Sequence, residues 1–230
     1  MKVTPGSLGE LRGRIAGPVN AGAGTVLRGG IDQLVRRNLR GVFLDGELPA
    51  GSCVWAANHH SWWDFFAAAA ALRAAGRHDV GVLMDAENVG RQSLFRQVGV
   101  VGTDRLRTAA EMLGDGWVLV VFPEGELRAP GPLGDIRPGA RWLADRSGAD
   151  LRTVATRVVL RGQQAPEAYL RLSGALASAD DVAIVLDADL RALDRSLATA
   201  DPMQPLPGFR SVVTGVRSWQ ERFGVLRGGR

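Results

Sequence analysis

A histidine and an aspartate stand five positions apart in the stretch Asn58–Asp64. The apolar run Cys53–Ala57 before this stretch predicts a strand, and the run Phe65–Arg73 after it predicts a helix. His59 would then lie at the strand's end, where Asp64, in the helix's first turn, can bond the far nitrogen of the imidazole. Such a bond fixes the tautomer and stabilises the charge that forms when a histidine accepts a proton. The alternative for this spacing is a buried histidine held by a nearby carboxylate.

No protein nucleophile accompanies this pair in the sequence. Ser61 is not part of a Gly-x-Ser-x-Gly motif, and the only cysteine, Cys53, lies upstream on the predicted strand. We therefore expect His59 to act as a general base that deprotonates a substrate hydroxyl directly, without a covalent intermediate. His60 is the rival base. It ranks second because its side chain should point away from that of His59 if the strand continues.

Two further stretches follow in a specific order. The run Trp117–Phe122 predicts a buried strand and continues into Pro123-Glu124-Gly125-Glu126, and the segment Gly99–Arg105, which ends in Asp-Arg, lies between this run and the histidine. Together with Asn58-His59-x4-Asp64, these stretches resemble the sequence blocks of the PlsC-like glycerolipid acyltransferases, also called lysophosphatidate acyltransferases. The resemblance covers about residues 40 to 175, and the order of the three blocks makes it specific.

The resemblance implies an O-acyltransferase of the 1-acylglycerol-3-phosphate type. His59 would deprotonate the acceptor hydroxyl while its oxygen attacks an acyl thioester of coenzyme A or acyl carrier protein. Arg105 would clamp a phosphate, Glu124 would hydrogen-bond the acceptor's hydroxyls, and Gly125 would let the backbone approach the ligand. We group Asn58 with these substrate-binding residues, although its tolerance of unusual backbone angles favours a role in the turn. No metal and no bound cofactor is required, because a thioester is already activated.

The chain departs from the family's pattern at two places. The third block usually continues Thr-Arg-Ser, whereas this chain has Glu126-Leu127-Arg128, and the Val-Pro pair of the fourth block appears as Val154-Ala155. These departures point to variation in the acceptor. The segment Arg157–Leu172 is loosely similar to a bacterial branch of the family, which adds a second acceptor hypothesis: a hydroxylated or glycosylated lipid such as a carotenoid glycoside.

Arginine supplies nearly all of the positive charge. The chain has 28 basic and 24 acidic residues, a net charge of +4, and Lys2 is its only lysine. Arginine suits phosphate groups, anionic lipid or nucleic acid, and a high-GC genome bias would give the same composition. A non-catalytic basic protein that binds membrane or nucleic acid is therefore the hypothesis of another class, and a thioester hydrolase is a third. We expect a lipid acceptor and a membrane surface as partners, and no nucleic acid, because no nucleic-acid-binding motif is present.

Alternating strands and helices predict an α/β fold with one domain, a mixed central sheet flanked by helices. We assign residues 41–230 to this acyltransferase domain and residues 1–40 to an N-terminal helical segment. Apolar residues recur at helical spacing in the second half of that segment, with arginines beside them, which predicts an amphipathic helix. Such a helix can lie in a membrane interface or pack on the domain with its arginines in water. The apolar positions are Ile31, Leu34, Val35 and Leu39, and the arginines are Arg36, Arg37 and Arg40.

The last third of the chain is predicted to add strands and then helices. Apolar runs predict strands at Val154–Leu160, Ala168–Leu172 and Val182–Leu186. A closing helix is predicted from the spacing of Phe209, Val212, Val213, Val216 and Phe223, which would pack on the sheet.

The sequence also carries an expectation about location. Residues 1–6 contain no apolar run behind a basic start, and no window reaches the ~18 apolar residues that span a bilayer. A single cysteine fits a reducing compartment. We expect a cytoplasmic protein that is peripherally associated with the inner face of the membrane.

Overall fold

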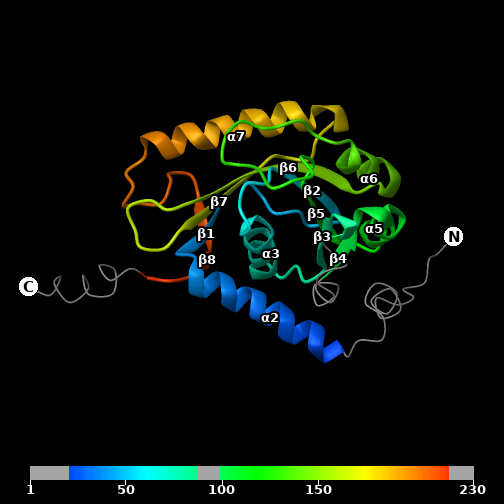
Figure 1. Cartoon of the computed structure of the whole chain (residues 1–230), viewed down its shortest axis with the longest axis horizontal. Helices are drawn as coiled ribbons and strands as arrows, with labels where there is room; N and C mark the ends of the chain where they lie inside the picture. The colour runs from blue at the N-terminus through cyan, green and yellow to red at the C-terminus, as the bar shows by residue number, and fades with distance from the viewer. Residues whose placement is uncertain (1–20, 88–98, 218–230) are drawn as a thin grey trace, which may run out of the picture.

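The computed structural model describes residues 21–87 and 99–217. This part of the chain forms one eight-stranded sheet with the strand order β4-β3-β5-β2-β6-β7-β1-β8, flanked by five α-helices (Figure 1). The strands are β1 (Gly41–Asp45), β2 (Cys53–Ala57), β3 (Val80–Met84), β4 (Val100–Gly102), β5 (Val118–Val121), β6 (Asp150–Val159), β7 (Glu167–Leu172) and β8 (Arg210–Thr214). The helices are α2 (Ala21–Asn38), α3 (Asp64–Ala74), α5 (Leu106–Gly114), α6 (Gly139–Ser147) and α7 (Val182–Thr199), with the 3-10 helices η2 (Thr103–Arg105) and η3 (Ala179–Asp181).

The sheet is mixed, as predicted. Strands β4, β3, β5, β2 and β6 run parallel, whereas β7 is antiparallel to β6 and β8 is antiparallel to β1. Within the parallel part, β2 and β5 are neighbours, with Ala56 opposite Val121. Because β2 and β5 are parallel, their carboxyl ends lie at the same end of the sheet, and the segments that begin at Asn58 and Phe122 emerge there side by side. That end is where α/β proteins bind their ligands.

Helices cover both faces of the sheet (Figure 1). Helices α2 and α3 lie on one face, and α5, α6 and α7 lie on the other. Strand β2 sends Trp55 into the core beneath α3 and Val54 into the core beneath α5 and α6. Since both of its faces are buried, every residue of β2 is buried, and the strand reads as one continuous apolar run.

Helix α7 begins where the sequence predicted a strand. The run Val182–Leu186 forms the first turns of this helix, so the strand prediction was wrong. Buried residues recur along the helix at Val182, Leu186, Leu190 and Leu193, a helical spacing that the five-residue window was too short to reveal.

The predicted closing helix is also wrong over the described residues. Residues Arg210–Thr214 form strand β8, which pairs antiparallel with β1 at the edge of the sheet. Adjacent β-branched residues, Val212 to Thr214, favour an extended backbone there. Val213 is buried, and the ring of Phe209 packs edge-on against Tyr169. Phe223 lies outside the described residues.

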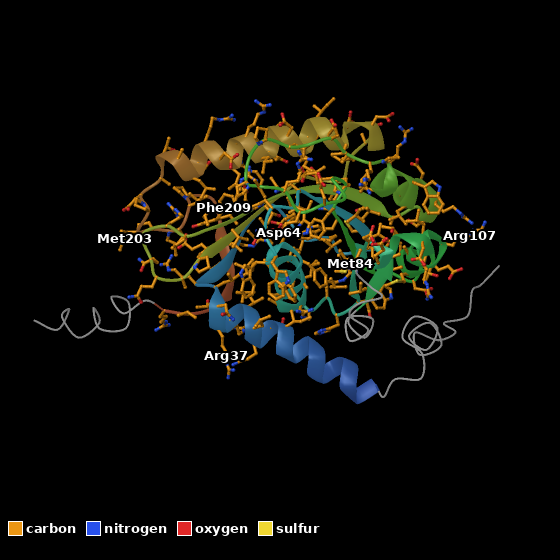
Figure 2. The ribbon with its side chains drawn as sticks, in the orientation of Figure 1. Arg37, Asp64, Met84, Arg107, Met203 and Phe209 are labelled. Carbon is orange, nitrogen blue, oxygen red and sulfur yellow. The ribbon has the colours of Figure 1, made fainter. Side chains whose placement is uncertain are left out.

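The predicted amphipathic helix is present as α2. Ile31, Val35 and Leu39 are buried against the sheet side, and Arg73 of α3 pairs with Asp32 across the helix interface. Figure 2 shows Arg37 on the side of α2 that faces away from the sheet. These contacts fit the interpretation that this part of α2 packs on the domain, while the membrane-surface interpretation and the boundary at residue 40 stay predictions. Residues 1–20 lie outside the described part. Among residues 21–87 and 99–217, no helix has both the length and the apolar character needed to cross a bilayer.

Small side chains let α3 lie close to the sheet. Residues Ala67–Ala71 are all buried, as the alanine run predicted, and the helix is followed by Gly76 at φ +81°.

We expect Ala69→Leu to destabilise the fold by about 1–3 kcal/mol, because Ala69 is fully buried and a larger side chain would force α3 away from the sheet. Ala74, which is exposed at the end of the same helix, gives the matched control Ala74→Leu, with a change within about 0.5 kcal/mol. Urea unfolding of the three proteins measures both effects. Equal midpoints for the two variants would contradict the close packing of α3.

Candidate active site

His59 and Asp64 meet as their spacing predicted. His59 follows β2, Asp64 begins α3, and His59 Nδ1 lies 3.0 Å from Asp64 Oδ2. Since a carboxylate only accepts, this contact assigns the proton of the neutral imidazole to Nδ1 and leaves a lone pair on Nε2. Nε2 is therefore the atom that can take a proton from a substrate. Figure 2 shows Asp64 near the middle of the molecule, at the start of α3.

The Asp64 carboxylate is held by the turn that leads to it. The backbone N–H groups of His60 and Ser61 donate to Oδ2 at 2.9 and 2.8 Å, and the Asp64 N–H donates to the Ser61 carbonyl at 3.1 Å. The carboxylate is only 2% exposed. Its position is thus fixed by backbone donors before any substrate binds.

The imidazole of His59 is also held from its face. Its ring stacks on Phe122 with the centroids 4.0 Å apart and the planes 17° from parallel, and its side chain is 23% exposed. Phe122 comes directly after β5, so the neighbouring strand orients the ring. This contact of Phe122, which directly precedes Pro123, was not predicted from the sequence.

Glu124 joins the two loops through backbone groups. Its Oε2 accepts from the His59 N–H at 2.9 Å and its Oε1 accepts from the Gly134 N–H at 2.9 Å. The Arg128 N–H in turn donates to the His59 carbonyl at 2.9 Å. The backbone of His59 is therefore bound on both sides by the loop after β5. The predicted contact of Glu124 with acceptor hydroxyls stays a prediction beside these two bonds.

Asn58 ties the same turn to β6. Its Oδ1 accepts from the Thr156 N–H at 2.7 Å, and its Nδ2 donates to the Thr156 carbonyl at 3.1 Å, so the buried amide pairs with the strand's backbone as another strand would. This contact gives Asn58 the turn-shaping role that its residue type favoured. Its grouping with the substrate-binding residues stays a prediction.

His60 lies in a different environment from His59. Its Nε2 accepts from the Val158 N–H at 3.2 Å, which requires the nitrogen to be unprotonated. Burial lowers the pKa of His60, and the charge of Arg157 lowers it further, while Asp64 acts in the opposite direction. With its lone pair used by β6, His60 is a poorer candidate base than His59.

Neither candidate nucleophile is hydrogen-bonded to a basic side chain in the described residues. Ser61 Oγ accepts from the Trp63 N–H at 3.2 Å. Cys53 is fully buried in β2, and this burial raises the pKa of its thiol to about 12. Within the described residues, no group of three His, Cys, Asp or Glu side chains is arranged to hold a metal ion.

Arg105 lies at the same edge of the sheet but farther along it. It ends η2 directly after β4, it is exposed, and β3 and β5 separate β4 from β2. At about 4.8 Å per strand, β4 is roughly 14 Å from β2. The structure thus places Arg105 at the same end of the parallel strands as His59, without contact to it. No ion pair joins it to Asp104 within the described part of the chain.

Gly125 and the residues after it are approached by arginines. Gly125 has φ +74°, which favours glycine, and the guanidinium of Arg137 lies against its Cα. Arg128 Nη1 bonds Glu126 at 2.9 Å, and its Nε lies 3.8 Å from Glu124. Ligand approach at Gly125 stays a prediction, and the group that approaches it here belongs to the protein.

The structure generates a pH-dependent prediction for His60. The pKa of His60 is lower in the folded protein than in the unfolded chain, so on acidification the unfolded chain binds a proton first. The contribution of His60 to the free energy of unfolding is therefore fully present above pH ~6.5 and falls as the pH drops below that value. Between pH 7.5 and 5.5, His60→Gln should therefore lose less stability than the wild type. Urea unfolding measures this difference, which should stay constant between pH 7.5 and 8.5. An equal loss in both proteins on acidification would contradict the buried neutral His60.

Comparisons with known proteins give the family and the fold. The Acyltransferase family model matches residues 38–157, a span that includes His59, Asp64, Arg105 and the loop after β5. Among solved structures, the chain is similar to the 1-acyl-sn-glycerophosphate (LPA) acyltransferase PlsC from Thermotoga maritima. The two share 16% sequence identity and a TM-score of 0.55, over 84% of this chain and 89% of that chain. No curated protein is significantly similar to this chain.

These matches confirm the predicted resemblance to PlsC-like acyltransferases at the level of family and fold. The likeness to PlsC at 16% identity shows a shared fold. The family model spans 120 of the 230 residues, from 38 to 157, which is more than half of the sequence. The chain belongs to the Acyltransferase family.

Proposed function

We propose that this acyltransferase moves a fatty acyl group from acyl-CoA or acyl-ACP to a hydroxyl of a lysophospholipid such as 1-acylglycerol-3-phosphate. The observation that carries the proposal is the pair formed by His59 and Asp64, in which Nδ1 is engaged at 3.0 Å and Nε2 is left to accept a proton. A glycerolipid acyltransferase, PlsC, shares the fold, which supports a lipid acceptor.

The proposed reaction proceeds by direct attack. His59 Nε2 takes the proton of the acceptor hydroxyl while its oxygen adds to the thioester carbonyl, and Asp64 stabilises the imidazolium that forms. The tetrahedral intermediate then expels the thiolate, which receives the proton back from His59. The products are an ester and a free thiol, and no atom of the protein is bonded to the acyl group.

The arginines Arg105 and Arg128 bear on the choice between two classes of acceptor. Arg105 is the proposed clamp for a phosphorylated head group, because it is exposed on the same edge as His59. The alternative is a hydroxylated or glycosylated lipid, and one observation favours it: Arg128, in the third block, is already bonded to Glu126. A neutral acceptor would need no free arginine in that block.

The proposed location is the cytoplasm, with the protein peripherally associated with the inner face of the membrane. Trp62 is 55% exposed three residues after His59, and Leu127 is 57% exposed next to the residue that bonds the His59 carbonyl. An exposed tryptophan close in sequence to the proposed base suits a membrane–water interface, where a lipid acceptor would be taken up.

Thiol release from palmitoyl-CoA, with and without lysophosphatidate, tests the proposal. We expect release that depends on the acceptor, and a fall of kcat by about 10³-fold in His59→Ala and about 10²- to 10⁴-fold in Asp64→Asn. His78→Ala is the matched control, since His78 is exposed and lies before β3 at the opposite end of the parallel strands. Its rate should equal that of the wild type.

Three outcomes would count against the proposal. Release that ignores the acceptor would favour a thioester hydrolase. Full activity of His59→Ala would remove the general base from the mechanism. A protein that binds lipid but shows no turnover with either donor and either acceptor class would favour the non-catalytic binding protein.

A further inference from the structure

The guanidinium of Arg137 is seated on Gly125. A Cβ added to Gly125 would lie 2.5 Å from Arg137 Cζ, 2.6 Å from Nε and 2.8 Å from Nη1. A side chain at position 125 would therefore push the guanidinium out of this place, which the glycine leaves open. The positive φ of Gly125, +74°, adds a second requirement for glycine at the same position.

Backbone bonds fix Arg137 relative to the loop after β5. The Arg137 N–H donates to the Pro123 carbonyl at 2.7 Å, and the Gly125 N–H donates to the Phe122 carbonyl at 2.9 Å. Glu124, between them, accepts from the His59 N–H. The backbone of Arg137 is therefore held next to Glu124, the residue that binds the backbone of His59, and its side chain extends from there over Gly125.

The other arginines around this loop have partners. Arg128 bonds Glu126, Arg157 forms a two-pronged ion pair with Asp194, and Arg141 pairs with Asp180. In the described ranges no carboxylate lies within ion-pair distance of the Arg137 guanidinium, and Arg137 is exposed. The first turn of α6, which begins two residues later, contains no acidic residue.

We propose that Arg137 determines acceptor specificity by binding the phosphate of the acceptor lipid from its seat on Gly125. The ligand chemistry is a phosphate monoester, whose oxygens match the two-pronged donors of a guanidinium. Arg137 is thus a cation for this phosphate in addition to the proposed clamp Arg105, at the loop where Arg128 is bonded to Glu126. This inference rests on the proposed function, since it assigns a residue to the acceptor of that reaction.

The experiment compares Arg137→Gln with Arg146→Gln, an exposed arginine near the other end of α6. The acceptors are octanoyl lysophosphatidate and octanoyl glycerol, which differ by the phosphate, with saturating palmitoyl-CoA. We expect Arg137→Gln to raise KM for lysophosphatidate by about 10- to 100-fold and to leave KM for the glycerol unchanged. Arg137→Lys should give an intermediate KM, because it keeps the charge and loses the two-pronged geometry. Arg146→Gln should match the wild type.

A second comparison separates the acceptor's phosphate from those of coenzyme A. If Arg137 binds the donor, Arg137→Gln would raise KM for palmitoyl-CoA and not for palmitoyl pantetheine, which carries no phosphate, and the proposal would be overturned. An equal change for both acceptors, or no change, would also overturn it.

Equilibrium binding of octanoyl lysophosphatidate, with no donor present, keeps this inference distinct from the proposed function. If the wild type turned over neither acceptor, the proposed function would fail, and the binding comparison would still decide on Arg137. Weaker binding in Arg137→Gln alone would support the site. Equal binding by Arg137→Gln, Arg146→Gln and the wild type would overturn it.

Discussion

The backbone of His59 is bound on both sides by the loop that follows β5, and the geometry of the site depends on this connection. Glu124 accepts from the His59 N–H, and the Arg128 N–H donates to the His59 carbonyl. These bonds are possible because β2 and β5 are parallel neighbours that end at the same edge. Two loops that are 65 residues apart in the sequence are thereby joined into one rigid unit. The imidazole needs such a support, since a base that is misplaced by 1 Å loses much of its effect.

The remaining polar contacts extend this unit to the rest of the sheet. Asn58 pairs with the backbone of Thr156 in β6, and Arg157, one residue on, reaches both Asp194 of α7 and the carbonyl of Gly131. The loop between β5 and α6 is thus held from β6 as well as from β2. Buried polar groups that are hydrogen-bonded favour one arrangement of the loops. The exception in the catalytic pair is Asp64 Oδ1, which is buried without a hydrogen-bond partner among the described residues, while Oδ2 accepts all three bonds to this carboxylate.

The arginine-rich composition has a structural explanation in the described residues. Glu167 is fully buried and accepts from Arg40, Arg161 and the hydroxyl of Tyr169. Arg77 donates to backbone carbonyls at the opposite edge of the sheet, including that of Gly116. Arginine suits this use because its planar group makes several bonds at once. Some of the chain's arginines therefore stabilise the fold through hydrogen bonds and ion pairs inside the protein.

Local patterns in the sequence predicted the parts of this structure that depend on neighbours along the chain. The five-residue spacing of His59 and Asp64 predicted their contact, and the alanine run predicted the buried face of α3. Two predictions failed: the five-residue run Val182–Leu186 was too short to show that it begins a helix, and apolar spacing from Phe209 onward was taken for a helix where Arg210–Thr214 pairs with β1 as strand β8. The contacts of Asn58 with Thr156 and of Arg137 with Gly125 could not be predicted, because the folded sheet creates them and no spacing in the sequence reports them.

The central claim is that His59 activates the acceptor hydroxyl directly, with no acyl group carried by the protein. Mass spectrometry of the intact protein, quenched after mixing with palmitoyl-CoA in the absence of acceptor, tests this most directly. The account predicts an unmodified protein mass, with the acyl group found on the lipid only when an acceptor is added. The account would be contradicted by a palmitoylated protein that forms and decays at the rate of turnover, whether the palmitoyl group is on Ser61, Cys53 or any other residue.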